Sequence, residues 1–509
     1  MRVWSRRELL VTGGGALLLA SCGTKALTSV GDAAVGPTDP SVERRGATRR
    51  RAGAATVTAT VTAALATVSI GGRDVATWAF GDRPGAGGIR AKVGDLVEAT
   101  FVNNLPSANT LHWHGIALRN DMDGVHDLTQ SPVDTSGKFT YRFTVPDAGT
   151  YWFHPHMGLE LDKGLYAPLI VEDPNDPVDF DIDVTLMLDD WLDGYGRTQD
   201  EVLAGLKTDG GHSEHMGGSS SSTGGMGGMG GMNQSSSGGM GSMMGGLTGD
   251  VTYPLHVING RAPSERETVR AKPGQRVRLR LINAGSDTAY RVAIGGHRMT
   301  VTHADGFPVA AVEVDNVVLG MGERYDVIVT AQSGAFPIIA LPEGKSDPAG
   351  EAILVTSDVS TVPTAGSRPA ELTGRTLRYG DLNASEEVRL PSKSPDRRET
   401  IHLTADSSGY VHGIDGRSFP DSAPITVREG ERLRLRVVNN TMMFHPIHLH
   451  GHTFQMVGDG NARKDTANVL PMSSVEVDIA ADNPGQWMLH CHNTYHLEMG
   501  MATVLSYRA

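Results

Sequence analysis

The residues around Cys491 have the types and spacing of a metal-binding site. His490 and His492 flank this cysteine, and His496 and Met501 follow shortly after it. A thiolate, two histidines and a methionine form the ligand set of a blue-copper electron-transfer site. Because neighbouring side chains on an extended strand point to opposite faces, His490 and His492 would face away from Cys491, on one side. One short segment could therefore serve two metal centres and connect them through its backbone.

Pairs of histidines separated by one residue recur in three other segments. These pairs are His112 and His114, His154 and His156, and His448 and His450, with His445 close before the last pair. Each pair would place two imidazoles on one face of a strand, about 7 Å apart at Cα and close enough to address adjacent metal ions. Alone, one such pair can arise by chance, and Cys491 could be an ordinary buried cysteine. Together the motifs favour metal, because burying eight imidazoles without it would be costly.

The only other cysteine, Cys22, ends an N-terminal targeting segment. Residues 5–10 carry paired arginines and precede the apolar residues 11–20, which are too few to span a bilayer as a helix. This segment resembles a twin-arginine signal, and residues 19–22 resemble a lipobox, in which the cysteine becomes lipid-modified. We therefore expect residues 1–22 to direct export, with a lipid anchor at Cys22 on the outer face of the cytoplasmic membrane. The alternative is a plain signal peptide with an incidental cysteine.

The composition favours a large, acidic all-β protein. Its 509 residues suit about three domains, and 63 glycines, 26 prolines and few aromatic residues favour short strands and turns. The net charge of −13, with no basic patch to offset it, argues against nucleic acid as a partner.

An internal repeat divides the chain into three parts. Turns at residues 92–95, 272–275 and 428–431 introduce alternating strands at residues 96–102, 276–282 and 432–438, and each strand runs into an asparagine. This repeat predicts three homologous β-sandwich domains, at residues 56–175, 178–357 and 372–509. Residues 23–55 mix glycine, proline, alanine and threonine with basic residues, so we expect a flexible tether there.

A methionine-rich insertion at residues 209–249 interrupts the second domain. Its methionines are Met216, Met226, Met229, Met232, Met240, Met243 and Met244, in a background of glycine and serine. Such a composition cannot form a core. Because thioethers are soft ligands that favour Cu(I), we interpret the insertion as a copper-collecting loop. A low-complexity linker with incidental methionines is the alternative.

The four histidine motifs and the Cys491 segment resemble those of the multicopper oxidases, above all the bacterial three-domain laccases and copper-tolerance oxidases. The match covers nearly the whole mature chain and implies three cupredoxin-like Greek-key β-sandwiches with four copper ions. The resemblance implies a type 1 copper held by His445, Cys491, His496 and axial Met501, a type 2 copper held by His112 and His448, and two type 3 coppers held by His114, His154 and His492 and by His156, His450 and His490. The last three ions would lie between domains 1 and 3, because domain 2 lacks these motifs.

The resemblance also implies a mechanism. A donor would give single electrons to the type 1 copper, and Cys491 with its flanking histidines would pass them to the trinuclear cluster, where O₂ becomes water. Asp123 matches the proton-relay carboxylate of the family, although Asp-Gly is also a common turn pair. Leu497 directly follows His496 and Glu498 comes one residue later, so no second relay carboxylate is assigned.

The methionine-rich insertion makes Cu(I) the preferred electron donor and copper detoxification the expected role. Asp465 matches a position where metal-oxidising relatives place a carboxylate beside the type 1 site, with a surface turn residue as the alternative. Methionines nearer the type 1 motifs are expected to pack in the core; they are Met442, Met443, Met472, Met488 and Met499. In the copper-tolerance relatives the insertion lies in the last domain, so their substrate-copper ligands do not transfer.

Other functions remain open. A laccase acting on phenols and aromatic amines is the second hypothesis, and oxidation of Fe(II) or Mn(II) is a third. A copper-binding or structural exported lipoprotein is the non-enzymatic alternative, which the complete ligand set disfavours. The partners expected are O₂ and the donor, with the chain acting as a monomer.

Overall fold

The computed structural model describes residues 34–208, 249–356, 361–406 and 410–509. This part of the chain is built around six sheets, two in each of three successive domains. The all-β prediction is therefore confirmed. The expected export signal at residues 1–22 lies outside the described residues, as does the methionine-rich insertion up to residue 248.

Domain 1 consists of two four-stranded sheets. The first has the order β2 (Arg73–Phe80), β1 (Thr56–Ile70), β4 (Leu96–Asn104) and β6 (Lys138–Thr144). The second has the order β3 (Ile89–Lys92), β8 (Ala167–Glu172), β7 (Gly149–His154) and β5 (His112–His114). Two histidine motifs thus lie at one edge of this second sheet.

Domain 2 contains a six-stranded and a five-stranded sheet. The larger has the order β10 (Leu255–Ile258), β9 (Ile182–Trp191), β12 (Arg276–Asn283), β17 (Arg324–Thr330), β14 (Met299–Ala304) and β15 (Phe307–Val314). The smaller has the order β11 (Glu267–Ala271), β19 (Gly350–Thr356), β18 (Ala335–Pro342), β13 (Tyr290–Ile294) and β16 (Asn316–Leu319).

Domain 3 has the same pair of sheet sizes. The larger has the order β21 (Val411–Ile414), β20 (Arg397–Asp406), β23 (Arg432–Asn439), β28 (Ser474–Ala480), β25 (Phe454–Val457) and β26 (Arg463–Lys464). The smaller has the order β22 (Ile425–Val427), β30 (Ala502–Tyr507), β29 (Gln486–Cys491), β24 (His445–Leu449) and β27 (Thr466–Val469).

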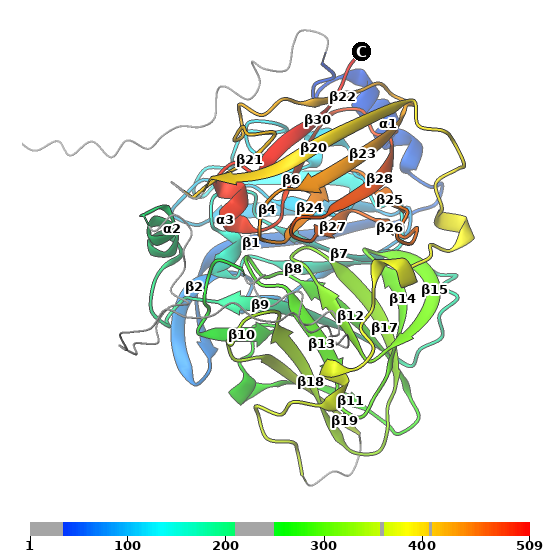
Figure 1. Cartoon of the computed structure of the whole chain (residues 1–509). Helices are drawn as coiled ribbons and strands as arrows, with labels where there is room; N and C mark the ends of the chain where they lie inside the picture. Colours follow the sequence, from blue (N-terminus) through cyan, green and yellow to red (C-terminus); the bar gives the residue numbers. More distant parts are fainter. Residues whose placement is uncertain (1–33, 209–248, 357–360, 407–409) are drawn as a thin grey trace, which may run out of the picture.

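The repeat predicted from the sequence corresponds to one strand per domain, β4, β12 and β23. Each of these strands lies parallel to the first strand of its domain and antiparallel to a later strand. The three domains therefore share a topology as well as a sequence pattern. One apolar core runs continuously through domains 1 and 3, whereas domain 2 has a core of its own. Figure 1 shows the same division, with the green strands of domain 2 below the other two domains.

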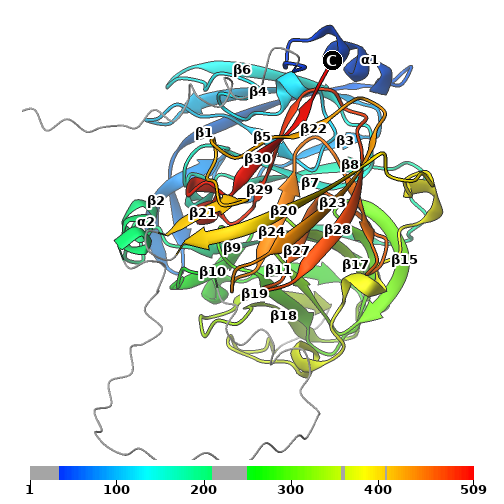
Figure 2. The ribbon, with the colours of Figure 1, turned by 45° about the horizontal axis from the view of Figure 1, so that its top comes forward.

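The described part of the expected tether contains a helix, which corrects the prediction for residues 34–55, whereas residues 23–33 lie outside the described residues. Helix α1 spans Pro40–Arg49, with Asp39 as N-cap and proline at the first helical position. Val42 is buried in the core of domains 1 and 3, and Arg49 Nη1 donates to the main-chain oxygen of Leu118. Both views show α1 beside the C-terminus (Figures 1 and 2). Residues 34–55 are thus docked on the molecule at several points.

The start of domain 3 also differs from the predicted residue 372. Three short 3-10 helices occupy this connection, η6 (Ala370–Thr373), η7 (Tyr379–Asp381) and η8 (Glu386–Val388). Leu372, Leu377 and Leu382 pack in apolar clusters of domain 2. The third sandwich therefore begins at β20, and the preceding segment is a strap on domain 2.

The remaining helices are short. They are α2 (Gln199–Thr208), α3 (Thr494–Glu498), η2 (Asn120–Met122), η3 (Leu161–Lys163) and η5 (Pro263–Glu265). Within the described ranges, none of the helices has the length and apolar character needed to cross a membrane.

Candidate metal centres

Two strand pairs bring the histidine motifs together. In domain 1, β5 pairs with β7 so that His112 lies opposite His154. In domain 3, β24 pairs with β29 so that His448 lies opposite His490. The imidazole of each motif then lies against a ring of the other domain. His112 stacks on His450 and His114 stacks on His448, each with ring centroids 3.7 Å apart. The structure thus unites four motifs that are far apart in the chain.

Several of these imidazoles have a buried nitrogen without a hydrogen-bond partner, as the ligand nitrogen of a metal site would be. Within the described residues, no hydrogen-bond partner exists for the buried atoms His112 Nε2, His154 Nε2, His156 Nε2, His448 Nε2 and His492 Nδ1. The opposite nitrogen of three of these rings donates to a main-chain oxygen: His112 Nδ1 to Asp123, His154 Nδ1 to Pro155 and His448 Nδ1 to Asp465. Such outer hydrogen bonds fix the tautomer and orient the ligand nitrogen.

His450 and His490 give the clearest sign of a cation between them. Their Nε2 atoms lie 3.0 Å apart. His450 Nδ1 donates to Asp123 Oδ2 and His490 Nδ1 donates to the main-chain oxygen of Cys491, so both Nε2 atoms carry lone pairs. Two facing lone pairs repel each other unless a positive ion lies between them. Nitrogens bound about 2 Å from one metal ion stand at a similar separation.

The ligand atoms fall into groups in which all members lie within 4.8 Å of one another. These groups include His156, His450 and His490; His112, His448 and His450; and His112, His114 and His154. His492 Nε2 also lies 3.2 Å from His114 Nδ1. All eight histidines expected at the trinuclear cluster are therefore brought together, and this group is called the histidine cluster below.

Burial favours the neutral form of seven of these imidazoles. It lowers the pKa of seven of them well below or below the usual value, assisted by neighbouring histidines: His114, His154, His156, His448, His450, His490 and His492. A neutral imidazole is the form that binds a metal ion. The electrostatics therefore agree with the unpartnered nitrogens.

A second cluster, called the sulfur cluster below, consists of Cys491, His445, His496 and Met501. Cys491 Sγ lies 3.6 Å from Nδ1 of both His445 and His496, and these two nitrogens are 3.1 Å apart. Met501 is buried, and its main chain bonds to the main chains of Cys491 and His496. Burial raises the pKa of the Cys491 thiol, so a metal ion would have to displace its proton. The structure brings together all four residues expected at the type 1 site.

The two clusters are connected through a single residue. Cys491 belongs to the sulfur cluster, and its main-chain oxygen accepts a 2.8 Å hydrogen bond from His490 Nδ1. Both strand neighbours of Cys491 face the histidine cluster, as the alternation of a strand requires. A short covalent and hydrogen-bonded path therefore joins the sulfur to the second centre.

Asp250, which the sequence analysis missed, holds the outer edge of the sulfur cluster. Its Oδ2 lies 3.0 Å from His496 Nε2 and accepts a 2.5 Å hydrogen bond from the Tyr410 hydroxyl. Asp250 follows the methionine-rich insertion directly, and this adjacency was the available signal. Val251 packs in an apolar cluster with Tyr410 and Tyr495.

The other end of the insertion is anchored in the same place. Helix α2 ends at Thr208, and its Val202, Leu203 and Leu206 belong to the apolar cluster that contains Tyr495, the neighbour of His496. Both ends of the insertion are thus attached beside the sulfur cluster, although its sequence belongs to domain 2.

Asp465 is neither beside the sulfur cluster nor at the surface, which corrects both hypotheses for it. It is fully buried, and its Oδ1 accepts from His114 Nε2 at 3.2 Å. Its Oδ1 and Oδ2 each lie 2.6 Å from the guanidinium of Arg324. Burial alone would raise the pKa of Asp465, but Arg324 and the hydrogen bonds from His114 and His448 lower it well below its usual range.

Asp123 occupies the corresponding position on the other side of the histidine cluster. Its main-chain oxygen accepts from His112 and its carboxylate from His450, as those of Asp465 accept from His448 and His114. Asp123 is fully buried. Each aspartate therefore binds one histidine of its own domain through its main-chain oxygen and one histidine of the other domain through its carboxylate.

The expectation that the methionines near the sulfur cluster pack in the core is wrong for two of them. Met442 is 70% exposed and Met472 is 68% exposed. They lie on adjacent loops, because Met472 N donates to the main-chain oxygen of Thr441. Met488 is buried as expected, and Met443 and Met499 are half-buried.

Comparison with known proteins points to the same chemistry. Family models described as "Multicopper oxidase" match residues 63–176, 183–358 and 389–509. The chain is 42% identical to "Multicopper oxidase MmcO" of Mycobacterium tuberculosis, over 99% of this chain and 97% of that relative. It is 28% identical to the "Copper resistance protein A homolog" of Pseudomonas syringae pv. tomato, over 81% and 86% of the two chains. Its fold resembles that in the crystal structure of Fet3p, "a Multicopper Oxidase that Functions in Iron Import", with a TM-score of 0.72 at 20% identity over 89% and 90% of the chains.

Proposed function

The chain belongs to the multicopper oxidase family, and on that premise we propose that it is an exported oxidase that takes single electrons from Cu(I) and delivers them to O₂. Membership in the family makes it a copper-dependent oxidoreductase. The choice of Cu(I) as the donor rests on one observation, which is the attachment of both ends of the methionine-rich insertion beside His496.

The residues fit a set of four copper ions. His445, Cys491, His496 and Met501 would hold the type 1 ion, and the eight histidines between domains 1 and 3 would hold the other three. Their unpartnered nitrogens and facing lone pairs support this assignment. Copper held by these residues would supply one-electron redox chemistry, by which four electrons and four protons convert one O₂ to two waters.

Cys491 and His490 provide the electron path between the centres. Their hydrogen bond leads from the sulfur cluster to the histidine cluster without an intervening residue. Asp250, which is 7% exposed, binds Nε2 of His496 and places a carboxylate next to the sulfur cluster. A carboxylate at that place favours Cu(I) over a neutral donor, because it attracts positive charge.

Asp123 is proposed to deliver protons for the reduction of O₂. Its buried carboxylate binds His450, and its main chain binds His112, so it touches two histidines of the cluster. Asp465 is unsuited to that role, because Arg324 holds both of its oxygens.

The sequence motifs at residues 5–10 and 19–22 support export by the twin-arginine route and anchoring at Cys22. The name of the copper resistance relative supports a role in copper detoxification. An oxidase on the outer face of the cytoplasmic membrane would convert Cu(I) there to Cu(II).

A paired measurement of O₂ consumption tests the donor. Replacing the seven methionines of residues 209–249 by serine should reduce turnover of Cu(I) by roughly tenfold and leave turnover of a phenol unchanged, because only Cu(I) needs thioether ligands. The substitution keeps the length of the insertion and leaves Asp250 in place, so the type 1 site is undisturbed. Equal losses for both donors, or no loss for Cu(I), would favour the laccase hypothesis.

A further inference from the structure

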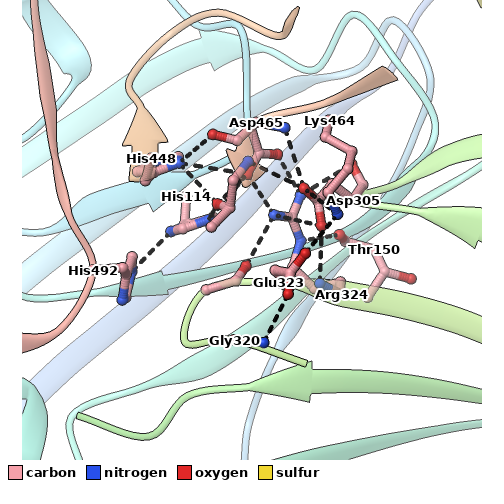
Figure 3. Close-up of polar contacts among 12 residues, drawn as sticks. His114, Thr150, Asp305, Gly320, Glu323, Arg324, His448, Lys464, Asp465 and His492 are labelled. Atoms are coloured by element: carbon pink, nitrogen blue, oxygen red, sulfur yellow. Dashed lines mark hydrogen bonds and ion pairs between the residues drawn. The ribbon is translucent and has the colours of Figure 1, made fainter. Parts of the chain in front are cut away.

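A cluster of five charged side chains lies behind His114 and His448, at the meeting point of the three domains (Figure 3). Its members are Asp305, Glu323 and Arg324 of domain 2 and Lys464 and Asp465 of domain 3, and none is more than 1% exposed. Burying charges costs several kcal/mol per ion, and well-packed apolar residues in the same place are often as stable or more so. The cluster therefore calls for a role other than stability.

Arg324 uses every donor of its guanidinium in this cluster. Nε donates to the main-chain oxygen of Thr150 in domain 1 at 3.0 Å. Nη1 and Nη2 donate to the main-chain oxygens of Gly322 and Asp305 in domain 2 and to the carboxylate of Asp465 in domain 3. One side chain thus contacts all three domains, with no donor left to move.

The main chain around Asp465 is fixed from domain 2 as well. Asp305 Oδ2 accepts from the backbone nitrogens of both Asp465 and Thr466 and pairs with Lys464 Nζ at 3.0 Å. The histidine motif itself leaves little space, because a Cβ at Gly115 would lie 2.5 Å from Arg324 Nη2 and 2.7 Å from Asp465 Oδ2. The carboxylate is therefore held in one orientation.

Asp123 occupies the corresponding position but lacks the contacts from Arg324 and Asp305 that hold Asp465, which are called the clamp below. It binds His112 and His450 as Asp465 binds His448 and His114, yet in the described part of the chain no arginine or lysine pairs with it. The clamp on Asp465 is thus a separate feature that domain 2 adds to one side of the cluster only.

We propose that Arg324 is a positioning residue through which domain 2, which supplies no copper ligand, sets the orientation of His114 and His448 by holding Asp465. Among the described residues, Arg324 donates only to oxygen atoms and bonds to no histidine nitrogen. It fixes the Asp465 carboxylate, which accepts from Nε2 of His114. It also keeps the main-chain oxygen of Asp465 within hydrogen-bond distance of Nδ1 of His448. The inference rests on the proposed copper ligands of the histidine cluster.

The test is the copper content and the spectra of the full-length Arg324→Lys protein. Lysine keeps the charge but cannot bind Asp465 through two nitrogens or reach Thr150, Gly322 and Asp305 together. We expect the blue type 1 absorption to remain while the type 2 signal in electron paramagnetic resonance is lost and copper affinity at the cluster falls about 10–100-fold. Copper content and spectra equal to wild type would overturn the proposal.

Arg280 offers a matched control. It is a buried arginine of β12 that also binds Thr150, through Oγ1, and pairs with Asp183 and Asp326. In the described part of the chain it pairs with neither Asp465 nor a histidine of the histidine cluster. Arg280→Lys should disturb the contact between domains 1 and 2 to a similar degree and keep the type 2 signal. Loss of that signal in both variants would assign the effect to domain contact in general and overturn the role of Arg324.

If Arg324→Lys does not fold, the Arg324→Met, Asp465→Asn double variant decides, because it leaves no unpaired buried charge. Its asparagine can still accept from His114, but nothing orients it. Retained type 2 copper in that folded variant would overturn the proposal, and selective loss would support it. A wild-type protein without type 2 copper would instead refute the proposed ligands themselves.

Discussion

Domains 2 and 3 have the same strand register, but domain 2 has apolar residues at the positions where domain 3 has the proposed metal ligands. In each domain the residue nine positions after the repeat asparagine lies opposite a residue of a later strand. These residues are His112 and His154 in domain 1, Val292 and Ala340 in domain 2, and His448 and His490 in domain 3. At the neighbouring pair, Leu341 of domain 2 stands where domain 3 has Cys491. Domain 2 is therefore the same scaffold with an apolar interior in place of ligands.

The scaffold is maintained by the repeat asparagine, independently of metal. Asn103, Asn283 and Asn439 each accept from the backbone nitrogen two residues ahead and donate from Nδ2 to main-chain oxygens of two later loops. The domain without ligands keeps these bonds as fully as the two with ligands. Fold and metal binding are thus specified by different residues, and domain 2 acts on the metal sites from outside, through residues such as Asp250, Asp305 and Arg324.

The largest expected effect comes from removing the residue that domain 2 lacks, Cys491. The Cys491→Ser variant should lose the blue absorption and all donor-dependent O₂ consumption, because a serine hydroxyl cannot provide the thiolate ligand. Serine is nearly the same size, so circular dichroism should be unchanged. Blue colour in the folded variant would refute the type 1 assignment.

Replacing His448 by valine, the residue at the equivalent position 292 of domain 2, should impair the histidine cluster without affecting the sulfur cluster. In His448→Val the blue absorption should persist, while O₂ consumption should fall by a factor on the order of 10² or more, since a metal ligand matters at least as much as its hydrogen-bonding support. Oxygen-electrode traces and copper analysis of the same sample check this. Normal O₂ consumption with the usual copper content would place the oxygen-reducing centre elsewhere.

The reverse exchange should harm domain 2 without creating a site. Val292 is fully buried, so Val292→His places an unpaired imidazole in the core and should lower the free energy of unfolding by about 3 kcal/mol. Val292→Leu, which adds apolar volume only, separates the polar cost from overpacking. Denaturant unfolding gives both values, and a histidine variant as stable as the leucine variant would contradict this account.

The comparison also explains what could be predicted from the sequence. The repeat and the ten histidines are readable because turns, alternating strands and ligand pairs lie within a few residues of one another. The contacts of Asp250 and Arg324 could not be predicted, because each side chain acts on a residue more than a hundred positions away in another domain. The sequence marks Asp250 only by its position next to the insertion. Asp465 was identified as important but placed at the wrong centre, since only the packing of domain 2 against His114 shows which cluster it serves. Helix α1 had a readable signal, Asp39 and Pro40, that the basic composition around it obscured.

The smallest expected effect concerns the shared scaffold. Replacing Asn103, Asn283 or Asn439 by alanine removes one buried acceptor and leaves main-chain oxygens unpaired, so each should cost about 2 kcal/mol of unfolding free energy. Because the three asparagines make equivalent bonds, the three losses should agree within about 0.5 kcal/mol in the apoprotein. Copper bound between domains 1 and 3 should raise the stability of wild type and of all three variants by mass action, and should leave each variant's loss relative to wild type unchanged. Differential scanning calorimetry with and without copper measures both quantities. A much smaller loss of unfolding free energy for Asn283→Ala than for the other two variants in the apoprotein would show that domain 2 is not the same scaffold. Its apolar residues could then not be compared with the ligands position by position.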